Sequence, residues 1–376
     1  MTAAPGGPGG PGGWRIARTA VVTGAAGQDG YLLTRRLLAE GSTVHAVVRP
    51  GSSREAIAVD AAEAPRLHVH AIDLADVAGL ADLIRTIRPD ELYNLAGLSS
   101  VSASFGDPLT TWETNARSVV TMLEAVRRDS PETRFYQASS SEMFGGLPGE
   151  SVVHDETSPL LPQSPYAAAK ASAHLACQVY RAAFGLRVAC GISFNHESSR
   201  RPGTFLTRKV VDHVRRLRDL GPAGRAGLAP MRMGNLGARR DWGFAPDYVE
   251  GILRISRQVE ARATLLGREP EPDTGAAYRD YILGTGELHG VWELVDRAFA
   301  LAGMDLDWDM TAVDPADWAA TFRDSGAVAV AVDAQLIRPA DPIAIQADPT
   351  RARVELGWTA RPGLDTFLAE MLANGG

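Results

Sequence analysis

Four polar side chains have the types and the spacing that proton transfer requires. Ser140 and Glu142 stand at the end of a short apolar segment, and Tyr166 precedes Lys170 by four residues. Residues four apart share one face of a helix, so the phenol and the ammonium group would point the same way. A phenol has an ordinary pKa of about 10, but a neighbouring cation favours the phenolate. The set predicts a catalytic site in which Tyr166 is the general base.

A tyrosine four residues before a lysine is common, and the alternative is a packed tyrosine beside a solvated lysine. The flanking sequence favours catalysis. Residues 134–138 alternate and carry two aromatic side chains, which predicts a strand that ends in serines. Ser164 suits a helix N-cap and Pro165 suits the first helical position, so a helix is predicted from there to Phe184. In an open parallel sheet, chemistry occurs at such strand ends.

A glycine-rich turn near the start of the chain predicts a dinucleotide site. Residues 19–23 form an apolar run, Gly24, Gly27 and Gly30 follow at three-residue spacing, and residues 31–40 are amphipathic. Such glycines let the backbone approach a pyrophosphate, and the helix N-terminus supplies free N–H groups. A plain tight turn is the alternative, which the strand–turn–helix context disfavours. The predicted cofactor contacts in this turn are Gly24, Gly27, Gln28, Asp29 and Gly30.

The next three predicted strands bear on the choice of cofactor. The strand at 43–48 ends at Arg49, which suits the 2′-phosphate of NADP, whereas NAD sites usually carry a carboxylate here. NADP is therefore the predicted cofactor, with a solvated loop charge as the alternative. The strand at 67–72 presents Asp73, which either contacts the adenine or caps a helix, and the strand at 91–95 leads into small residues. The cofactor contacts predicted here are Arg49, Asp73, Leu74, Leu95 and Ala96.

The order of the predicted elements indicates the fold class. Strands and helices alternate as far as Phe194, including a helix at 107–128, which is typical of a Rossmann-type α/β fold with a doubly wound parallel sheet. A polar, loop-like stretch at 195–203 breaks this rhythm. The remainder predicts a smaller C-terminal α/β lobe, with helices or strands at 205–220, 231–235, 246–255, 281–283, 290–302 and 364–372.

These elements divide the chain into three predicted parts. Residues 1–17 form a disordered Gly/Pro-rich tail, which lacks the charged start and apolar centre of a signal peptide. Residues 18–194 form an NADP-binding domain, to which segments near 234–262 return. Residues 195–233 and 263–376 form the substrate-binding lobe.

Composition excludes several classes of partner. The net charge of −7 gives no basic surface for nucleic acid, and no apolar run reaches the roughly 18 residues of a membrane span. Cys177 and Cys190 are the only cysteines and lack Cys-x-x-Cys spacing, which indicates buried thiols in a reducing compartment. The histidines form no ligand pattern. We predict a cytoplasmic protein with no metal, no nucleic-acid partner and no membrane partner.

Seven motifs in register resemble those of a known family. They are TGAAGQDG (23–30), LYNLAGLSSV (92–101), FYQASSSEMFG (135–145), SPYAAAKASAH (164–174), FNHESSRRPGTFLTRK (194–209), GNLGARRDWGFAPDYVEG (234–251) and ADPTRARVELGW (347–358). The chain resembles the extended short-chain dehydrogenase/reductases and, within that superfamily, the GDP-mannose 4,6-dehydratase family. The ordered combination of motifs is far more specific than any one of them.

The resemblance implies a reaction without net redox change on a GDP-sugar. Tyr166 would take the proton of the sugar 4-hydroxyl while hydride passes from C4 to NADP, and the new ketone would acidify the C5 hydrogen. Glu142 would remove that hydrogen as a proton, water would leave from C6, and the hydride would return to C6. Lys170 would hold the cofactor ribose and lower the pKa of Tyr166, while Ser140 would hydrogen-bond the 4-oxygen.

The same resemblance implies the remaining contacts. The arginines of the second lobe would be solvated charges in isolation, but guanidinium groups bind phosphate in a bidentate manner. Arg240 and Arg338 would hold the diphosphate, and Lys209 would contact the base. A homodimer or homotetramer is the expected assembly. The implied substrate contacts are Ser99, Ser141, Asn195, Lys209, Arg240 and Arg338, and the further cofactor contacts are His196 and Arg201.

The chain departs from the family pattern at a few positions. Ser140 stands where the family often has threonine, which keeps the hydroxyl. The paired arginine after the second strand appears as Arg49-Pro50, which removes one charge from the expected NADP contact. Phe244 stands where histidine is common, and the sequence does not explain this change.

Two rival functions and the identity of the sugar stay open. An epimerase or ketoreductase of the same superfamily would share Tyr166, Lys170 and the glycine turn, but a simple 4-epimerase needs no base such as Glu142 for C5. A non-catalytic NADP-binding sensor would not need the intact catalytic set. The substrate is either GDP-mannose or a longer relative such as a GDP-heptose.

Overall fold

The computed structural model describes most of the chain. The described residues are 18–52, 57, 59–145, 151–225, 228–314, 317–337, 344–361 and 363–374. The predicted tail at 1–17 and the predicted diphosphate contact Arg338 lie outside the described residues.

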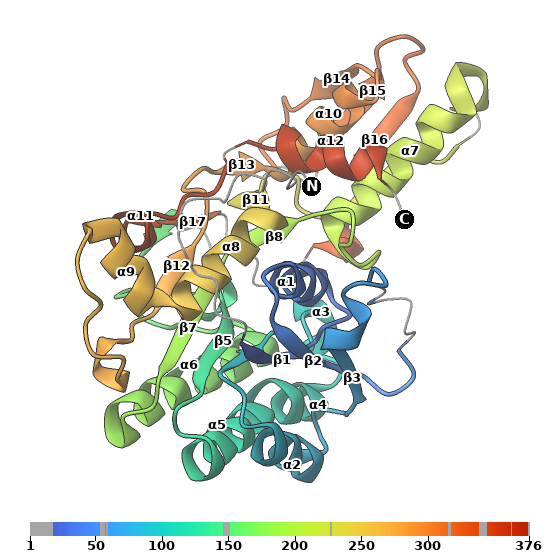
Figure 1. Ribbon diagram of the computed structural model, residues 1–376. Helices are drawn as coiled ribbons and strands as arrows, with labels where there is room; N and C mark the ends of the chain where they lie inside the picture. The colour runs from blue at the N-terminus through green and yellow to red at the C-terminus, as the bar shows by residue number, and fades with distance from the viewer. Residues whose placement is uncertain are drawn as a thin grey trace.

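A seven-stranded parallel sheet forms the centre of the molecule (Figure 1), in the order β12-β7-β5-β4-β1-β2-β3. The chain runs outward from β1 to β3 and then crosses back to β4 on the other side of β1. This reversal of strand order is the point at which doubly wound sheets bind ligands. The predicted fold class is confirmed. The strands are β1 (Thr19–Thr23), β2 (Thr43–Val48), β3 (Leu67–Ala71), β4 (Glu91–Asn94), β5 (Arg134–Ser140), β7 (Val188–Ser193) and β12 (Tyr281–Leu283).

Helices cover both faces of this sheet because successive strand residues point to opposite sides. Val22 packs into the core beneath α1 and α8, whereas Val21 packs into the core beneath α2, α5 and α6. Both strand faces are therefore apolar, as expected for a parallel sheet. The helices are α1 (Gln28–Ala39), α2 (Val77–Ile87), α4 (Pro108–Trp112), α5 (Ser118–Asp129), α6 (Pro165–Phe184) and α8 (Ala245–Ser256).

The predicted helix at 107–128 is interrupted. A π-helical turn, η3 (Glu113–Arg117), separates α4 from α5. Helix α1 begins at Gln28, three residues before the predicted start, whereas α6 has the predicted bounds and its N-cap Ser164 accepts a hydrogen bond from the Ala167 N–H. Periodicity locates these helices, but it does not reveal the extra residue that a π turn inserts.

Apart from the large sheet, the described residues form three small sheets, one of which takes β6 from the range predicted for the cofactor domain. Their orders are β13-β10-β17-β6, β11-β8 and β14-β15-β16-β9. The loop predicted at 195–203 is wrong at its start, because Asn195–Glu197 pair with Trp242–Phe244 as a short strand. The strands are β6 (Ser151–His154), β8 (Asn195–Glu197), β9 (Met231–Met233), β10 (Arg239–Arg240), β11 (Trp242–Phe244), β13 (His289–Gly290), β14 (Leu306–Asp309), β15 (Ala319–Phe322), β16 (Val328–Val332) and β17 (Ala344–Ala347).

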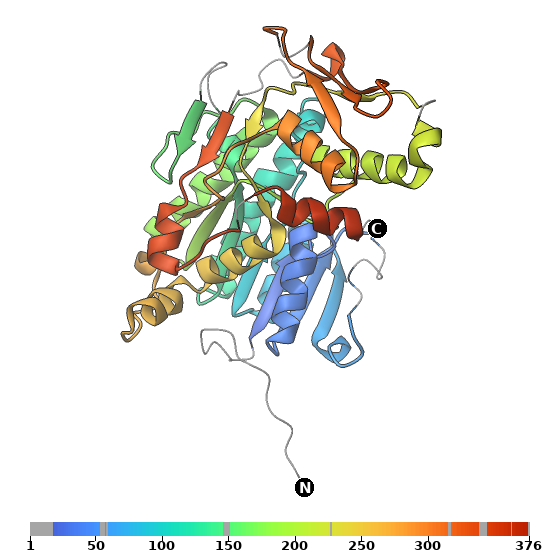
Figure 2. The same cartoon turned by 90° about the horizontal axis from the view of Figure 1, so that it is seen from above.

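Three helices share a second core with the β14–β16 sheet. They are α7 (Leu206–Arg225), α10 (Val291–Leu301) and α12 (Asp365–Ala373), which pack against one another (Figure 2) and lie apart from the large sheet (Figure 1). Strand β12 lies in the range predicted for the substrate lobe, yet it is an edge strand of the large sheet. The division into a cofactor domain and a substrate lobe stays a prediction. The remaining helices are α3 (Val101–Ser104), α9 (Gln258–Leu266) and α11 (Thr350–Leu356).

Among the described residues, none of the helices combines the length and the apolar character that a bilayer crossing needs.

Candidate active site

A cavity of about 390 Å³ lies at the carboxyl ends of β4, β5 and β7 and extends to β8 and β10. Residues from both halves of the chain line it. All four predicted catalytic side chains are among them. The predicted site residues that the cavity brings together are Asp29, Leu95, Ser99, Ser140, Ser141, Glu142, Tyr166, Lys170, Asn195, His196, Arg201 and Arg240.

Other predicted contacts lie away from this cavity. Arg49, Asp73 and Lys209 are exposed, the first two at the ends of β2 and β3 and the third on α7. The Asp73 carboxylate accepts the Ala75 N–H at 2.9 Å, while Asp76 is the N-cap of α2. The described part of the cavity lining does not include the remaining predicted contacts Gly24, Gly27, Gln28, Gly30, Leu74 and Ala96.

The glycine turn fits a dinucleotide because its backbone leaves no room for side chains. Gly24 has φ +70°, and a Cβ there would lie 2.9 Å from the backbone of Ala96. A Cβ on Gly30 would lie 2.1 Å from the Gly24 carbonyl oxygen. The N-terminus of α1 therefore meets the ends of β1 and β4 as bare backbone. N–H groups at such a helix end bind pyrophosphate oxygens.

The two polar side chains of this turn bind the opposite wall of the cavity. Gln28 donates from Nε2 to the His196 carbonyl at 3.0 Å, and its Oε1 accepts the Ser198 hydroxyl at 2.9 Å. The Asp29 carboxylate lies 2.9 Å from Nε2 of His196. These contacts join residues almost 170 positions apart, so the turn and strand β8 form one unit.

Asp29 and His196 form a partly buried pair of ionisable side chains. Burial alone would lower the pKa of His196, but the Asp29 carboxylate raises it above its usual value. Burial alone would raise the pKa of Asp29, but His196 lowers it below its usual value. When protonated, the imidazole partly neutralises the carboxylate beside the expected pyrophosphate position.

The π turn η3 places Asn115 against the loop that follows β4. Its Oδ1 accepts the Leu98 N–H at 2.8 Å and its Nδ2 donates to the Leu98 carbonyl at 2.9 Å. A Cβ on Gly97 would lie 2.7 Å from Asn115 Oδ1 and 3.6 Å from Lys170 Nζ. Asn115 thus fixes the loop that leads to Ser99. Asn115 was not predicted as a site residue, although an asparagine inside the predicted helix at 107–128 was a possible signal.

The catalytic wall is the junction of β5 with α6. The Lys170 ammonium donates to the Ala138 carbonyl at 2.9 Å, which joins the helix to the last residues of the strand. Ser140 then caps the short 3₁₀ turn Ser141–Met143, with its hydroxyl 3.3 Å from the Glu142 N–H. Ser140, Glu142, Tyr166 and Lys170 consequently line one wall of the cavity.

Burial governs the ionisation of this wall. It raises the pKa of Tyr166 to about 12, with Glu142 adding to the rise and a hydrogen bond with Ser140 and the nearby Arg201 opposing it. Burial lowers the pKa of Lys170 to about 8. In this arrangement the Lys170 ammonium is directed to the Ala138 carbonyl, and burial outweighs the groups that lower the pKa of Tyr166. The expected lowering of the Tyr166 pKa by Lys170 stays a prediction.

Asp241 organises the strands around Arg240. Its buried carboxylate accepts hydrogen bonds from the Thr285 N–H at 2.9 Å, the Thr285 hydroxyl at 2.6 Å and the Gly286 N–H at 2.8 Å. A weaker one comes from the Ala347 N–H at 3.3 Å. These contacts hold β17 beside β10, which carries Arg240. Sequence reasoning quoted the surrounding motif but gave Asp241 no role.

Arg201 reaches the cavity from the loop after β8. Its guanidinium group pairs with Glu197 at 3.1 Å and stacks over the Phe205 ring at 3.7 Å. Both contacts orient the planar group, which suits bidentate binding of phosphate. The expected cofactor role of His196 and Arg201 stays a prediction, but both side chains line the cavity.

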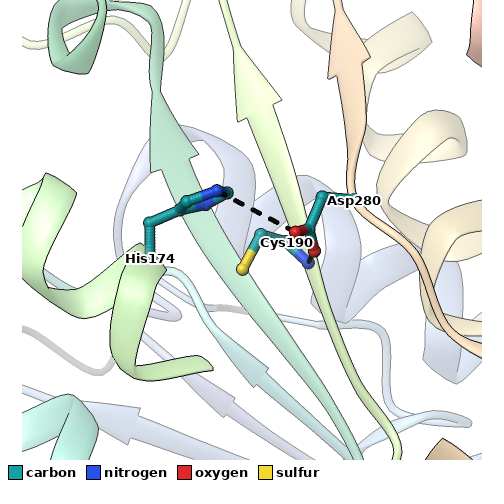
Figure 3. Close-up of side chains that lie close together, drawn as sticks. All are labelled: His174, Cys190 and Asp280. Atoms are coloured by element: carbon teal, nitrogen blue, oxygen red, sulfur yellow. Dashed lines mark hydrogen bonds and ion pairs between the residues drawn. The ribbon is translucent and has the colours of Figure 1, made fainter. Parts of the chain in front are cut away.

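One buried cluster has side chains of metal-ligating types. Among the described residues, His174, Cys190 and Asp280 form the group whose potential ligand atoms lie within 4.8 Å of one another (Figure 3). Both Asp280 oxygens, however, accept from Arg181 at 2.7 and 2.9 Å. Burial raises the pKa of the Cys190 thiol well above its usual value. An occupied carboxylate and a protonated thiol are poor metal ligands.

The doubly wound sheet, the glycine turn and the joint placement of the serine, glutamate, tyrosine and lysine define a short-chain dehydrogenase/reductase. A family model described as GDP-mannose 4,6 dehydratase matches residues 21–371. The chain belongs to the GDP-mannose 4,6-dehydratase family, and the resemblance seen in its motifs is confirmed.

Relatives across several kingdoms support this membership. The chain is 34% identical to the GDP-mannose 4,6-dehydratase of Yersinia enterocolitica, covering 95% of this chain and 93% of that protein. It is 36% identical to GDP-mannose 4,6 dehydratase 2 of Arabidopsis thaliana, covering 94% and 86%. It is 34% identical to the GDP-mannose 4,6 dehydratase of Homo sapiens, covering 94% and 90%.

Solved structures share the fold at lower identity. DesIV, a dTDP-glucose 4,6-dehydratase from Streptomyces venezuelae with NAD and TYD bound, has a TM-score of 0.71 at 23% identity, covering 94% of this chain and 96% of that chain. RMD from Pseudomonas aeruginosa, complexed with NADPH, has a TM-score of 0.70 at 19% identity, covering 96% and 97%. These likenesses establish the architecture.

The Asp29–His196 pair predicts a pH-dependent stability. Because the folded-state pKa of His196 is raised, its stabilisation is complete below the ordinary value of about 6.5 and is lost as pH rises through the folded-state pKa. Urea unfolding of the wild type and of Asp29→Asn should show it. Between about pH 6 and about pH 9, the free energy of unfolding of the wild type should fall by about 1–2 kcal/mol more than that of the variant.

Asp73→Asn is the matched control, since Asp73 is exposed and bonds only its own turn. Its pH profile should parallel that of the wild type. Parallel profiles for all three proteins would contradict the charged pair.

Proposed function

We propose that the protein catalyses the 4,6-dehydration of GDP-mannose, giving the 4-keto-6-deoxy sugar nucleotide and water. Family membership supports the reaction class. The observation that carries the proposal is that one cavity wall presents a phenol, an amine and a separate carboxylate, Glu142. A 4-epimerase or ketoreductase needs the first two, whereas only a dehydratase also needs a base for C5.

The proposed redox group is a nicotinamide dinucleotide, which supplies a hydride acceptor for C4 and a hydride donor for C6 when bound. The glycine turn and the α1 N-terminus would hold its pyrophosphate. Lys170 would bind its ribose, and Asp29, Leu95, His196 and Arg201 would line its path. The bare backbone of the turn supports this placement.

NADP is the proposed form of the cofactor. Its support is the basic residue Arg49 at the end of β2, where NAD sites usually carry a carboxylate. Arg49 is exposed, so its guanidinium group can turn to a 2′-phosphate. Asp73 and Leu74, at the end of the neighbouring strand β3, would contact the adenine.

In the proposed first half-reaction, Tyr166 removes the proton of the sugar 4-hydroxyl. The raised pKa of about 12 means that the phenolate needs positive charge beside it. Lys170 supplies part of that charge, because its ammonium group has three hydrogens and can bind a ribose hydroxyl while one hydrogen stays on the Ala138 carbonyl. Ser140 hydrogen-bonds the 4-oxygen, and so holds it beside the phenol.

In the proposed second half-reaction, Glu142 removes the C5 proton, which the new 4-ketone has acidified. The same carboxyl group then gives its proton to the 6-hydroxyl, which leaves as water. A solvent proton is added at C5 when the hydride reaches C6, and Tyr166 releases to solvent the proton that it took from the 4-hydroxyl. The carboxylate therefore needs access to both C5 and C6, and its position beside Ser140 in the cavity supports this role.

The nucleotide end of the substrate is assigned to the second half of the chain. Arg240, with Arg338 as its partner, would hold the diphosphate, and Asn195, Ser99 and Ser141 would contact the sugar or diphosphate. Lys209 would meet the base at the mouth of the cavity, since its α7 neighbours Leu206 and Thr207 line that cavity.

The proposal also assigns a binding role to each part of the chain and a cellular location to the protein. Residues 18–194, with segments near 234–262, would bind the cofactor, while 195–233 and 263–376 would bind the nucleotide sugar. Two buried free cysteines are compatible with a reducing cytoplasm.

We also infer that the chain forms a homo-oligomer through α4 and α6. These helices pack against each other, and each exposes large apolar side chains. Leu109 is 79% exposed on α4, and Leu175 and Val179 are 51% and 56% exposed on α6. Large exposed apolar side chains on two packed helices favour a protein interface, and a second copy offers the same side chains in return.

Two substitutions separate the half-reactions. Tyr166→Phe should abolish the first hydride transfer and leave cofactor affinity within about threefold, because only the phenolic oxygen is removed.

Glu142→Gln should still oxidise C4 and then stall, so reduced cofactor accumulates while C5 exchange with solvent deuterium falls by a factor of at least about 100. Single-turnover absorbance of reduced nicotinamide, with mass spectrometry of the sugar, measures both.

Formation of the 6-deoxy product by Glu142→Gln at the parent rate would overturn the role of Glu142. Exchange at C5 without cofactor reduction would overturn the order of steps. An epimerase or ketoreductase would give no 4-keto-6-deoxy product in the wild type, and a sensor would give no turnover.

Arg49→Ala tests the cofactor. Loss of one charge-assisted contact to a 2′-phosphate should weaken NADP binding about 10-fold or more while NAD changes less than about threefold. Fluorescence titration with both reduced cofactors measures this, with Arg85→Ala on α2 as the control. Equal weakening of both cofactors, or of neither, would make Arg49 a solvated charge.

Leu109→Arg tests the assembly. Placing a charge in the α4–α6 surface should shift the mass measured by light scattering from oligomer toward monomer. Val354→Arg, an exposed apolar position of α11, should leave the mass unchanged. A monomeric wild type, or equal behaviour of both variants, would contradict this interface.

A further inference from the structure

Helix α6 carries a third polar side chain in line with the two catalytic ones. Tyr166, Lys170 and His174 follow one another at four-residue spacing, so they share one helix face. They are 8%, 6% and 4% exposed, respectively. The proposed reaction uses the first two and gives His174 no part. A buried polar side chain in this row requires a reason.

His174 holds the strand exit that the catalytic wall is built on. Its Nδ1 lies 3.0 Å from the Ser139 hydroxyl. Ser139 directly follows Ala138, whose carbonyl accepts the Lys170 ammonium at 2.9 Å, and directly precedes Ser140. Two successive residues of β5 are thus bound from α6 by two side chains one helical turn apart.

The hydrogen of the Ser139 contact comes from the ring. Gln178 donates from Nε2 to Asp280 at 3.1 Å, and the same nitrogen lies 3.1 Å from Nε2 of His174. An amide nitrogen only donates, so the neutral ring accepts at Nε2 and carries its hydrogen on Nδ1. A protonated ring also has a hydrogen on Nδ1. Either form therefore donates to the Ser139 hydroxyl.

The far side of the imidazole is anchored as well. Asp280 accepts from Arg181, from Gln178 and from the Cys190 N–H at 2.9 Å, so its carboxylate is fixed between α6 and β7. Figure 3 shows the His174 ring directed across Cys190 toward Asp280. With both ring nitrogens engaged in a dry site, the imidazole has one orientation available.

We infer that His174 is a positioning residue for catalysis. Through Ser139 it fixes the peptide between Ala138 and Ser139, and so it fixes both the carbonyl that directs Lys170 and the hydroxyl of Ser140. This inference rests on the proposed function, which assigns catalytic roles to Lys170 and Ser140. A shift of about 1 Å in such groups can lower a rate about 100-fold.

Two substitutions distinguish the two ends of the ring. Asn places its amide nitrogen near the position of Nδ1, whereas Gln places its amide near the position of Nε2. His174→Asn should therefore keep the bond to Ser139, and His174→Gln should lose it while keeping the contact with Gln178 and Asp280. We expect kcat within about threefold of the wild type for His174→Asn and about 10- to 100-fold lower for His174→Gln. KM and cofactor affinity should change less than about threefold in both.

A double-mutant cycle tests the route through Ser139. Ser139→Ala should lower kcat about as much as His174→Gln, and the double variant should be no worse than either one. His213→Gln, a substitution of a partly buried histidine on α7, is the control for general loss of stability and should leave kcat unchanged. Additive losses, equal losses in the Asn and Gln variants, or an unchanged kcat in His174→Gln would overturn the inference.

A second readout does not depend on turnover. The chain contains two lysines, Lys170 and Lys209. In Lys209→Arg, used only for spectroscopy, the single lysine ε-carbon signal in a ¹³C-lysine NMR spectrum belongs to Lys170. Adding His174→Gln should move this signal and its titration midpoint, and adding His174→Asn should leave both within error. A wild type that does not turn over GDP-mannose would contradict the proposed function. The NMR spectrum would then still test whether His174 positions Lys170. An unmoved signal in His174→Gln would overturn the inference.

Discussion

The hydrogen bond from Lys170 Nζ to the Ala138 carbonyl is the contact on which the catalytic wall depends. It joins the exit of β5 to α6, which the Ser139–His174 hydrogen bond and apolar packing also hold together. Tyr166 lies one helical turn before Lys170, and Ser140 lies two residues after Ala138. The Lys170–Ala138 hydrogen bond therefore places the Tyr166 phenol beside the Ser140 hydroxyl. Burial lowers the pKa of the Lys170 ammonium group to about 8 because the charged form loses its hydration. Each additional hydrogen-bond acceptor therefore stabilises the charged form.

The cavity is closed by polar contacts between distant parts of the chain. Asp29 and His196 bind the glycine turn to β8, and Asp241 binds the loop after β12 and the strand β17 to the arginine-bearing strand β10. Each of these carboxylates is satisfied by partners that the sequence places far away. Segments far apart in the chain are consequently held together around the cavity.

The sequence predicts the large sheet and its catalytic edge because those features are local. The bounds of β1, β2 and α6 follow from apolar runs, the Ser164 cap and Pro165, and the Tyr166–Lys170 face follows from helical spacing. The π turn at Asn115, the short strand β8 and the fourfold-bonded Asp241 were not predictable, since each depends on a partner more than ten residues away or on one inserted residue. The rise of the Tyr166 pKa through burial was not predictable for the same reason, as burial is a tertiary property.

The most direct measurement of the central claim follows one hydrogen atom. GDP-mannose carrying deuterium at C4 is incubated with the holoenzyme without added reductant, and the product is examined by NMR. The account predicts a 4-keto-6-deoxy sugar nucleotide with the deuterium at C6, transferred within one active-site cycle, and a solvent hydrogen at C5. Deuterium lost to free cofactor, or a product that keeps its 6-hydroxyl, would contradict a dehydratase in which Tyr166 and Glu142 serve one substrate in turn.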